Sequence, residues 1–405
     1  MRVLLVPFLF PTHYLPMVGL AWALRLHGHE VLVATAPKLA ATVAQSGMTS
    51  VTVGPDFDFL DSPELKQQGA KWAKHASDGP TVSLLEAIMR GPVDRYAMAA
   101  EAMADDLVAL AETWRPDVVL SDPLAFAGPL AAEVSSAVSV RHLWGPDTAR
   151  NYRMPGSGFG APDDVSAVPW EFIPWPDRLT ALYERFGAKA ADDLAEYTID
   201  PCPESMQFPG GLRRRPIRYT AYNGGGTIPR RLLEPHDKPR VCVTWGTATT
   251  STLSANYFGV PKALDALRDL DAEIVVAART ADVALINDMP GNVIAAEPLP
   301  LDALLPTCDA IVHHGGAGTL FTAARHGLSQ LTLGILTEQR ANCSQLARQG
   351  AGVFLPFEQA DRASVRASVA ELLEPGPVRT KAAELREEIA RQPSPVEVAE
   401  SMTAM

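Results

Sequence analysis

The sequence is poor in cysteine and in positive charge, and each shortage excludes a class of protein. Four cysteines occur among 405 residues, too few for a disulfide scaffold, and no two have metal-ligand spacing. Lys and Arg number 35 against 47 Asp and Glu, a net charge of −12. A protein whose main partner is nucleic acid is normally basic on at least one face. The longest basic run, Arg213–Arg215, is typical of a solvated loop, so we expect no nucleic-acid partner.

A membrane-spanning segment is also missing from the pattern. Residues 3–24 carry no charged side chain, which is long enough for a span. However, Pro7, Pro11 and Pro16 lie inside this stretch, and prolines break a spanning helix. A small-residue cleavage site of a signal peptide is not evident either. We therefore expect reduced thiols, no membrane contact and a cytoplasmic location.

Apolar runs and helix signals alternate from the first residues onward. Residues 2–10 predict a buried strand, and Pro16 opens a helix that Gly28 ends. Residues 30–35 predict a second strand, and residues 49–53 a third, after a helix that begins at Pro37. This β-α-β-α-β order is typical of a parallel, doubly wound sheet.

The same alternation restarts in the second half of the chain. Residues 209–239 are rich in Gly and Pro and predict an interdomain linker. The sequence thus predicts an α/β protein of two Rossmann-like parallel-sheet domains that face a cleft, residues 1–208 and 240–390. Residues 391–405 predict a helix that crosses back to the first domain. Further strands are expected at 117–121, 241–245, 273–277, 292–295, 310–313 and 330–333.

The glycine motifs exclude one enzyme class and indicate another kind of site. A nicotinamide or flavin enzyme would carry G-x-G-x-x-G after its first strand, but that loop here is Pro11-Thr12-His13-Tyr14. The signal occurs instead at residues 313–319, His-His-Gly-Gly-Ala-Gly-Thr, between a buried strand and a helix. Glycines and a helix N-terminus allow backbone N–H groups to approach an anion, which predicts a diphosphate site.

Two polar side chains follow buried strands of the first domain. His13 comes after the first strand, in a loop, and Asp122 follows the strand at 117–121. Ligands bind at the carboxyl ends of such strands, so His13 is a candidate general base. A carboxylate on one imidazole nitrogen would fix its tautomer. The alternatives are a structural loop histidine and, for Asp122-Pro123, an ordinary turn.

The sequence resembles a known family in its most specific stretch, HHGGAGTLFTAARHGLSQLTLGILTEQRANCSQLARQGAG at residues 313–352. DPCPESMQ at 200–207 and AYNGGG at 221–226 add to the likeness. The chain is similar to GT-B fold, inverting nucleotide-sugar glycosyltransferases that decorate macrolide and aromatic polyketide aglycones. This resemblance implies an acceptor-binding first domain, a donor-binding second domain and His13 as the base.

The resemblance also implies a set of donor contacts. The diphosphate would lie against His314 and the helix N-terminus, the sugar hydroxyls against the acidic-Gln pair Glu338-Gln339, and the pyrimidine beside Pro298-Leu299. Glu338 stands where the family usually has Asp. The implied donor-binding residues are Gly246, Thr247, Pro298, Leu299, His314, Gly316, Ala317, Gly318, Thr319, Thr322, Glu338 and Gln339.

Thr322 bears on the identity of the donor. Uridine-diphosphate users of the resembled family carry Glu at this position, where it grips both ribose hydroxyls. Thr leaves no buried carboxylate unpaired when the 2′-hydroxyl is absent, so we expect a dTDP-sugar donor. The alternative is that Thr322 only packs on its helix. Asp56 and Asp58 have D-x-D spacing but no phosphate motif nearby, so we expect no metal and no other cofactor.

The expected activity is therefore transfer of a (deoxy)sugar to a hydrophobic polyketide-type aglycone. Three alternatives stay open: transfer to an aromatic carbon, epimerisation of a nucleotide-sugar, and a non-catalytic nucleotide-sugar-binding partner. The resemblance further implies a possible homodimer or auxiliary activator protein. The sequence does not decide between these.

Overall fold

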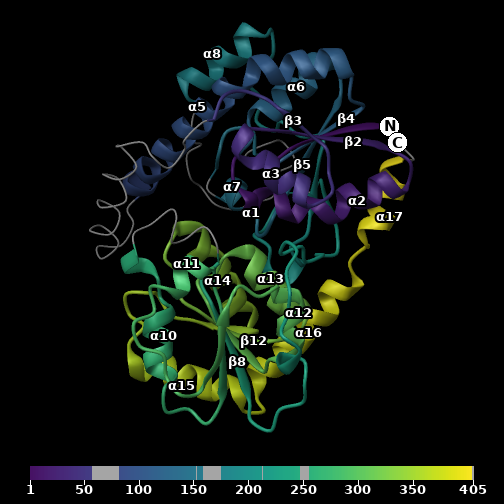
Figure 1. Ribbon diagram of the computed structural model, residues 1–405. Helices are drawn as coiled ribbons and strands as arrows, with labels where there is room; N and C mark the ends of the chain where they lie inside the picture. Colours follow the sequence, from purple (N-terminus) through teal and green to yellow (C-terminus); the bar gives the residue numbers. More distant parts are fainter. Residues whose placement is uncertain (57–81, 152, 158–174, 212, 247–254, 404–405) are drawn as a thin grey trace.

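The chain folds into two α/β lobes, one above the other in Figure 1. The computed structural model describes residues 1–56, 82–151, 153–157, 175–211, 213–246 and 255–403. The upper lobe is built on a seven-stranded sheet of order β3-β2-β1-β4-β5-β6-β7, and the lower on a six-stranded sheet of order β10-β9-β8-β11-β12-β13. Every neighbouring pair is parallel. Both sheets are doubly wound, as the sequence predicts.

The elements of the first lobe are the strands β1 (Arg2–Val6), β2 (Glu30–Thr35), β3 (Ser50–Thr52), β4 (Val118–Ser121), β5 (Val138–His142), β6 (Tyr197–Asp200) and β7 (Arg214–Pro216), and the helices α1 (Pro11–Tyr14), η1 (Leu15–Met17), α2 (Val18–Leu26), α3 (Pro37–Gln45), α5 (Val82–Trp114), α6 (Ala127–Ser135), α7 (Thr148–Asn151), α8 (Asp177–Arg185) and η2 (Glu204–Met206).

Those of the second lobe are the strands β8 (Arg240–Thr244), β9 (Glu273–Ala277), β10 (Val293–Glu297), β11 (Ala310–His313), β12 (Ser329–Thr332) and β13 (Gly352–Phe354), and the helices η4 (Ala255–Tyr257), α10 (Val260–Leu267), α11 (Thr280–Val283), α12 (Leu301–Leu304), η5 (Leu305–Thr307), α13 (Ala317–Arg325), α14 (Thr337–Gln349), α15 (Arg362–Leu373) and α16 (Pro377–Arg391). The last helix, α17 (Pro395–Thr403), returns to the first lobe. The short helix η3 (Arg230–Leu232) precedes β8.

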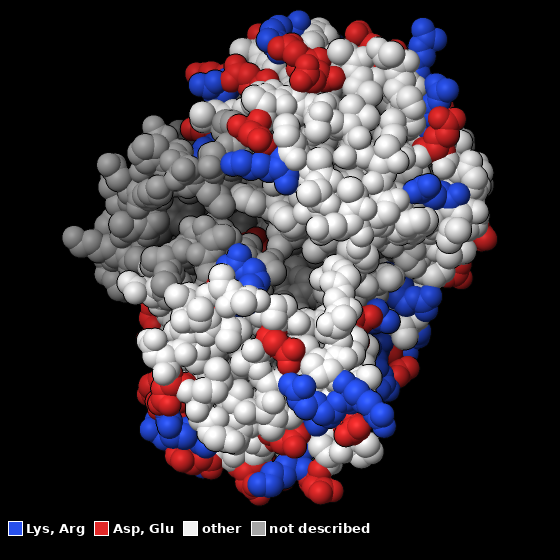
Figure 2. All heavy atoms as spheres, viewed as in Figure 1, with Lys and Arg blue, Asp and Glu red and all other residues white. Residues whose placement is uncertain are grey.

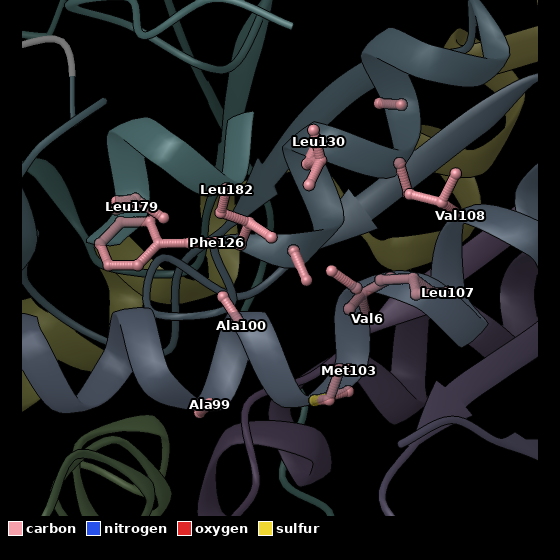
Figure 3. Close-up of a cluster of buried hydrophobic side chains, with 14 of the residues drawn as sticks. Val6, Ala99, Ala100, Met103, Leu107, Val108, Phe126, Leu130, Leu179 and Leu182 are labelled. Atoms are coloured by element: carbon pink, nitrogen blue, oxygen red, sulfur yellow. The ribbon is translucent and has the colours of Figure 1, made fainter. Parts of the chain in front are cut away.

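Strand β1 lies inside the first sheet and is buried on both faces. Leu4 and Val6 pack into one apolar cluster, while Val3 and Leu5 pack into another on the opposite face. Figure 3 shows the first cluster, in which Val6 lies beside Leu107 and Met103 of α5, and side chains of α6 and α8 complete the cluster. Apolar residues at successive positions suit a strand covered by helices on both sides. Because β1 is held inside the sheet, the loop after it emerges at the carboxyl end of the parallel strands.

Two expectations about local structure are wrong. Strand β1 ends at Val6 rather than residue 10, because Pro7 has no N–H for the ladder. The helix expected from Pro16 already begins at Pro11, which occupies the first helical turn, where proline is tolerated. His13 therefore lies on the short helix α1 and not in a loop. The rest of the stretch continues through η1 into α2.

The linker is also shorter than expected. Strand β7, at Arg214–Pro216 inside the predicted linker, pairs with β6 as the edge of the first sheet. Three residues give too weak a periodicity to distinguish an edge strand from a loop. The connection between the sheets therefore begins after Pro216.

A shared apolar cluster, which we call the interdomain cluster, joins the two lobes. Trp144, Cys202 and Met206 of the first lobe pack with Tyr219 of the linker against second-lobe residues of α13, α14, α16 and the short turn after α14. Those residues are Ala317, Leu320, Phe321, Ala324, Leu346, Ala351, Ala382, Leu385 and Ile389. The loop after β5 approaches α13 closely, because a Cβ added at Gly145 would lie 3.0 Å from the Cβ of Ala317.

The C-terminal helix α17 packs on the first lobe. Val398, Ala399 and Met402 are buried in the same cluster as residues of α2, and Figure 1 shows α17 beside α2. None of the described helices is long and apolar enough to cross a membrane.

Replacing Met402 by Ala tests the contribution of α17 to the first lobe. Met402 is 3% exposed, so the cavity should lower the free energy of unfolding by about 2 kcal/mol. Val396 lies on the same helix but is 44% exposed, and Val396→Ala should cost less than about 0.5 kcal/mol. Urea unfolding of both variants measures the difference. Equal effects would contradict the docking of α17.

Candidate functional site

His13 lies on α1, which follows the carboxyl end of β1 after the short loop of residues 7–10. Phe10 is the N-cap of α1, and its carbonyl accepts a hydrogen bond from the His13 N–H at 3.0 Å. Figure 2 shows the molecule hollowed between its two lobes, with both signs of charge mixed over their outer ends. The position of α1 after β1 places His13 at the carboxyl edge of the sheet, where ligands of parallel α/β proteins bind.

Asp122 directly follows β4, the neighbour of β1. Its Oδ2 accepts a hydrogen bond from Nδ1 of His13 at 2.8 Å, and its Oδ1 accepts one from the Leu124 N–H at 2.8 Å. The Asp122 side chain is fully buried, whereas that of His13 is 12% exposed. The carboxylate therefore fixes the proton on Nδ1 and leaves the lone pair of Nε2 available.

Opposing effects set the pKa of His13. Burial lowers this pKa, but the Asp122 carboxylate outweighs burial through its charge and hydrogen bond, and Glu338 adds a smaller effect. The net result is a pKa above the ordinary value of histidine. Glu338 belongs to α14 of the second lobe, so the charges of both lobes act on His13.

Aromatic rings surround His13. The ring centroids of Trp144 and Phe8 lie 5.3 and 5.5 Å from that of His13, both edge-on. Phe10 lies 6.0 Å away, and Tyr96 of α5 packs edge-on against Phe8 at 5.3 Å. An imidazole set among aromatic rings suits an apolar, planar ligand better than a polar one.

The first histidine of the glycine-rich motif is structural. His313, at the end of β11, accepts a hydrogen bond from the Gly315 N–H on Nδ1 at 3.1 Å, and its Nε2 donates to Oε1 of Gln330 at 2.9 Å. Both ring nitrogens are therefore used inside the turn. Burial lowers the pKa of His313 to about 4, so the ring stays neutral.

The second histidine, His314, lies between two glycine backbones. A Cβ added at Gly246 would lie 2.6 Å from Cε1 of His314, and one added at Gly316 would lie 2.5 Å from Nε2. Only glycine leaves room for the ring at either position. Burial first, and then His313, lowers the pKa of His314 to about 3. His314 is therefore a neutral hydrogen-bonding group, and its Nδ1 has no partner among the described residues.

Helix α13 begins beside His314 without a side-chain cap at Gly316. The first N–H group bonded within the helix belongs to Leu320, which donates to the Gly316 carbonyl at 3.0 Å. The N–H groups of Ala317, Gly318 and Thr319 precede it and have no partner within the helix. Together with the helix dipole they form an anion-binding end.

The acidic-Gln pair opens α14. Burial raises the pKa of Glu338, and the facing His13 partly offsets this rise. Gln339 is differently placed, because its Oε1 accepts hydrogen bonds from the Ile335 and Leu336 N–H groups, both at 3.2 Å. Glu338 thus faces His13 of the other lobe, while the Gln339 side chain holds the turn before α14.

Thr322 is buried, with its hydroxyl occupied by protein groups. Its Oγ1 donates to the Gly318 carbonyl at 2.6 Å and lies 3.2 Å from the hydroxyl of Tyr219. This geometry corresponds to the packing alternative. A ribose hydroxyl would have to displace one of these partners.

Two other residues expected to contact the donor lie in the loop after β10. Pro298 is exposed and Leu299 is half-buried. Thr247, Phe57 and Asp58 lie outside the described residues. Among the residues that the structure describes, no three His, Cys, Asp or Glu side chains gather as metal ligands would.

Sequence reasoning missed two residues that connect the parts of this site. Trp144 contacts His13 and packs in the interdomain cluster with Ala317, the first residue of α13. The hydroxyl of Tyr219, in the linker, donates a hydrogen bond to the Gly318 carbonyl of α13. Neither belongs to a short motif, and their contacts join segments more than 90 residues apart, so no local signal identifies them.

Comparison with known proteins covers the whole chain. The N-terminal domain model of the erythromycin biosynthesis protein CIII-like family matches residues 22–246, and its C-terminal domain model matches residues 247–405. Tylactone mycaminosyltransferase of Streptomyces fradiae is 38% identical over 419 residues, which cover 98% of this chain and 90% of that protein. Aclacinomycin-T 2-deoxy-L-fucose transferase of Streptomyces galilaeus is 34% identical, over 100% of this chain and 96% of that protein.

Solved structures of the same kind share the fold. The glycosyltransferase VinC, in complex with dTDP, has a TM-score of 0.81 at 31% identity and covers 100% of this chain and 99% of its own. Spinosyn rhamnosyltransferase SpnG, in complexes with thymidine diphosphate and with spinosyn aglycone, has a TM-score of 0.79 at 30% identity, with full coverage of both chains. With its GT-B fold, this chain belongs to the erythromycin biosynthesis protein CIII-like family of glycosyltransferases.

Proposed function

We propose that the chain is an inverting glycosyltransferase that moves a (deoxy)sugar from a dTDP-sugar to a hydroxyl of a polyketide-type aglycone. The observation that carries this proposal is the 2.8 Å bond between His13 and the buried Asp122, placed opposite Glu338 of the other lobe. Two relatives are named as transferases that act on tylactone and on aclacinomycin-T. These names support a polyketide-type acceptor.

His13 acts as the general base in this proposal. Its Nε2 takes the proton of the acceptor hydroxyl, and the acceptor oxygen then attacks the anomeric carbon. The bond from that carbon to the diphosphate breaks, with its electron pair passing to the diphosphate oxygen. Asp122 stabilises the imidazolium that forms. Attack from the face opposite the leaving group inverts the configuration.

The leaving diphosphate lies at the N-terminus of α13 in this proposal. The free N–H groups of Ala317, Gly318 and Thr319 and the neutral ring of His314 supply hydrogen bonds to its oxygens. We propose that these groups stabilise the departing charge without a metal ion. The aromatic rings around His13 receive the aglycone, and Glu338 and the amide of Gln339 are placed for the sugar hydroxyls.

Replacing His13 by Ala tests the base. Transfer should fall by about 10²–10⁴, while dTDP binding, measured by calorimetry, should persist because the donor groups lie on the other lobe. His29→Ala, which removes a histidine distant from Asp122 in the same lobe, should leave transfer unchanged. Wild-type rates in His13→Ala would exclude this residue as the base.

The pH dependence gives a second test of the same pair. His13 must be unprotonated, so kcat/KM should rise with pH through a pKa above the ordinary histidine value. In Asp122→Asn the rise of kcat/KM should occur at lower pH, because the charge that raises the pKa of His13 is gone. The value of kcat should also fall. If kcat/KM rises at the same pH in Asp122→Asn as in the wild type, Asp122 does not act on His13.

Replacing His314 by Ala tests the diphosphate site. Binding of dTDP should weaken by about 1–3 kcal/mol, the usual worth of a hydrogen bond to a charged group. Thymidine, which has no phosphate, should bind both proteins equally. His236→Ala provides a control in the same lobe. If His314→Ala still prefers dTDP over thymidine as strongly as the wild type does, His314 does not contact the phosphates.

Competition between dTDP and UDP for the donor site tests which nucleobase and which sugar of the nucleotide the site prefers. No carboxylate stands at position 322 to bind both ribose hydroxyls, and the Thr322 hydroxyl is already bonded to Gly318. A 2′-hydroxyl therefore gains little here, and dTDP should bind more tightly than UDP. A clear preference for UDP would overturn the donor assignment.

A further inference from the structure

Side chains of the linker form hydrogen bonds with the first turns of α13. The Tyr219 hydroxyl donates to the Gly318 carbonyl at 3.0 Å. The Thr322 hydroxyl donates to the same carbonyl at 2.6 Å and accepts from Nδ2 of Asn223 at 3.4 Å. Two hydroxyl groups thus converge on one backbone oxygen, in addition to the ordinary helix bond.

The converging donors act on a peptide group that faces the anion-binding end. The Gly318 carbonyl shares its peptide plane with the N–H group of Thr319, the last of the free N–H groups in α13. A hydrogen bond accepted by a peptide oxygen polarises the N–H group of that peptide and makes it a stronger donor. The Tyr219 and Thr322 hydroxyls therefore strengthen and orient the N–H group that the proposed diphosphate meets.

Tyr219 is held rigidly enough for this role. Its side chain is 6% exposed and packs with Phe321 of α13 at a ring distance of 5.6 Å. Burial raises the pKa of Tyr219 to about 12, so the hydroxyl keeps its proton and stays a donor. The neighbouring Arg218 N–H donates to the Pro393 carbonyl at 2.7 Å, which ties this part of the linker to the segment before α17.

We propose that Tyr219 is a positioning residue for the donor diphosphate, acting through the Gly318 carbonyl on the Thr319 N–H group. The inference rests on the proposed function, since it requires the diphosphate to lie at the N-terminus of α13. Through Tyr219, the linker sets the strength of donor binding, although it touches neither phosphate nor sugar.

Tyr219→Phe removes one hydroxyl and keeps the ring in the interdomain cluster. Calorimetry with dTDP and with thymidine should show about two- to threefold weaker dTDP binding, because the Thr319 N–H group loses only the polarising contribution of this hydroxyl, and unchanged thymidine binding. Donor KM should rise by the same factor, with acceptor KM unchanged. Thr322→Val, which removes the second hydroxyl with little change of shape, should act in the same direction.

Tyr222→Phe is the matched control, because that hydroxyl comes from the same linker but donates to the Gln45 carbonyl at 3.3 Å, away from α13. It should bind dTDP as the wild type does. Unchanged dTDP binding in Tyr219→Phe, or an equal loss for dTDP and thymidine, would overturn the positioning role. A wild type that binds dTDP no better than thymidine would instead refute the proposed diphosphate site.

Discussion

The apolar contact between the lobes is the constraint on which the rest of the site depends. Trp144 lies edge-on to His13 and packs beside Ala317, the first residue of α13, in the interdomain cluster. A single buried side chain thus adjoins both the imidazole and the anion-binding helix. Catalysis by orientation requires such groups to keep their separation to within a fraction of an ångström. Close packing at this junction supplies that rigidity.

The two histidines His13 and His314 differ in pKa because their surroundings differ. His13 has a carboxylate on Nδ1, which raises its pKa despite burial. His314 is buried without a carboxylate partner among the described residues, and its pKa falls to about 3. His13 therefore takes up a proton more readily than an ordinary histidine, while His314 stays neutral and only donates or accepts hydrogen bonds. This division suits a proton acceptor on one lobe and an anion contact on the other.

The sequence predicted the elements whose signals are local. The glycine run at 313–319 does mark the turn before α13, and His13 and Asp122 follow adjacent strands and meet, as the strand order allows. Other features depend on contacts that no local pattern contains. The Thr322 hydroxyl also meets Tyr219, which lies 103 residues away in the sequence, and β7 pairs with the edge that β6 offers. The helical position of His13 was missed because Pro16 resembles a helix start more strongly than Pro11 does.

The return of α17 to the first lobe gives the chain two connections between lobes. They run side by side, since the Arg218 N–H bonds to the Pro393 carbonyl at 2.7 Å and the Arg218 guanidinium to the Ala390 carbonyl at 3.2 Å. In chain topology, the second lobe is an insertion into the first and not an appended domain. Opening of the molecule would pivot about this paired crossing. A chimaera that exchanges the second lobe with that of a relative must therefore be cut at both crossings, so that α17 stays with the α2 surface that it evolved to cover.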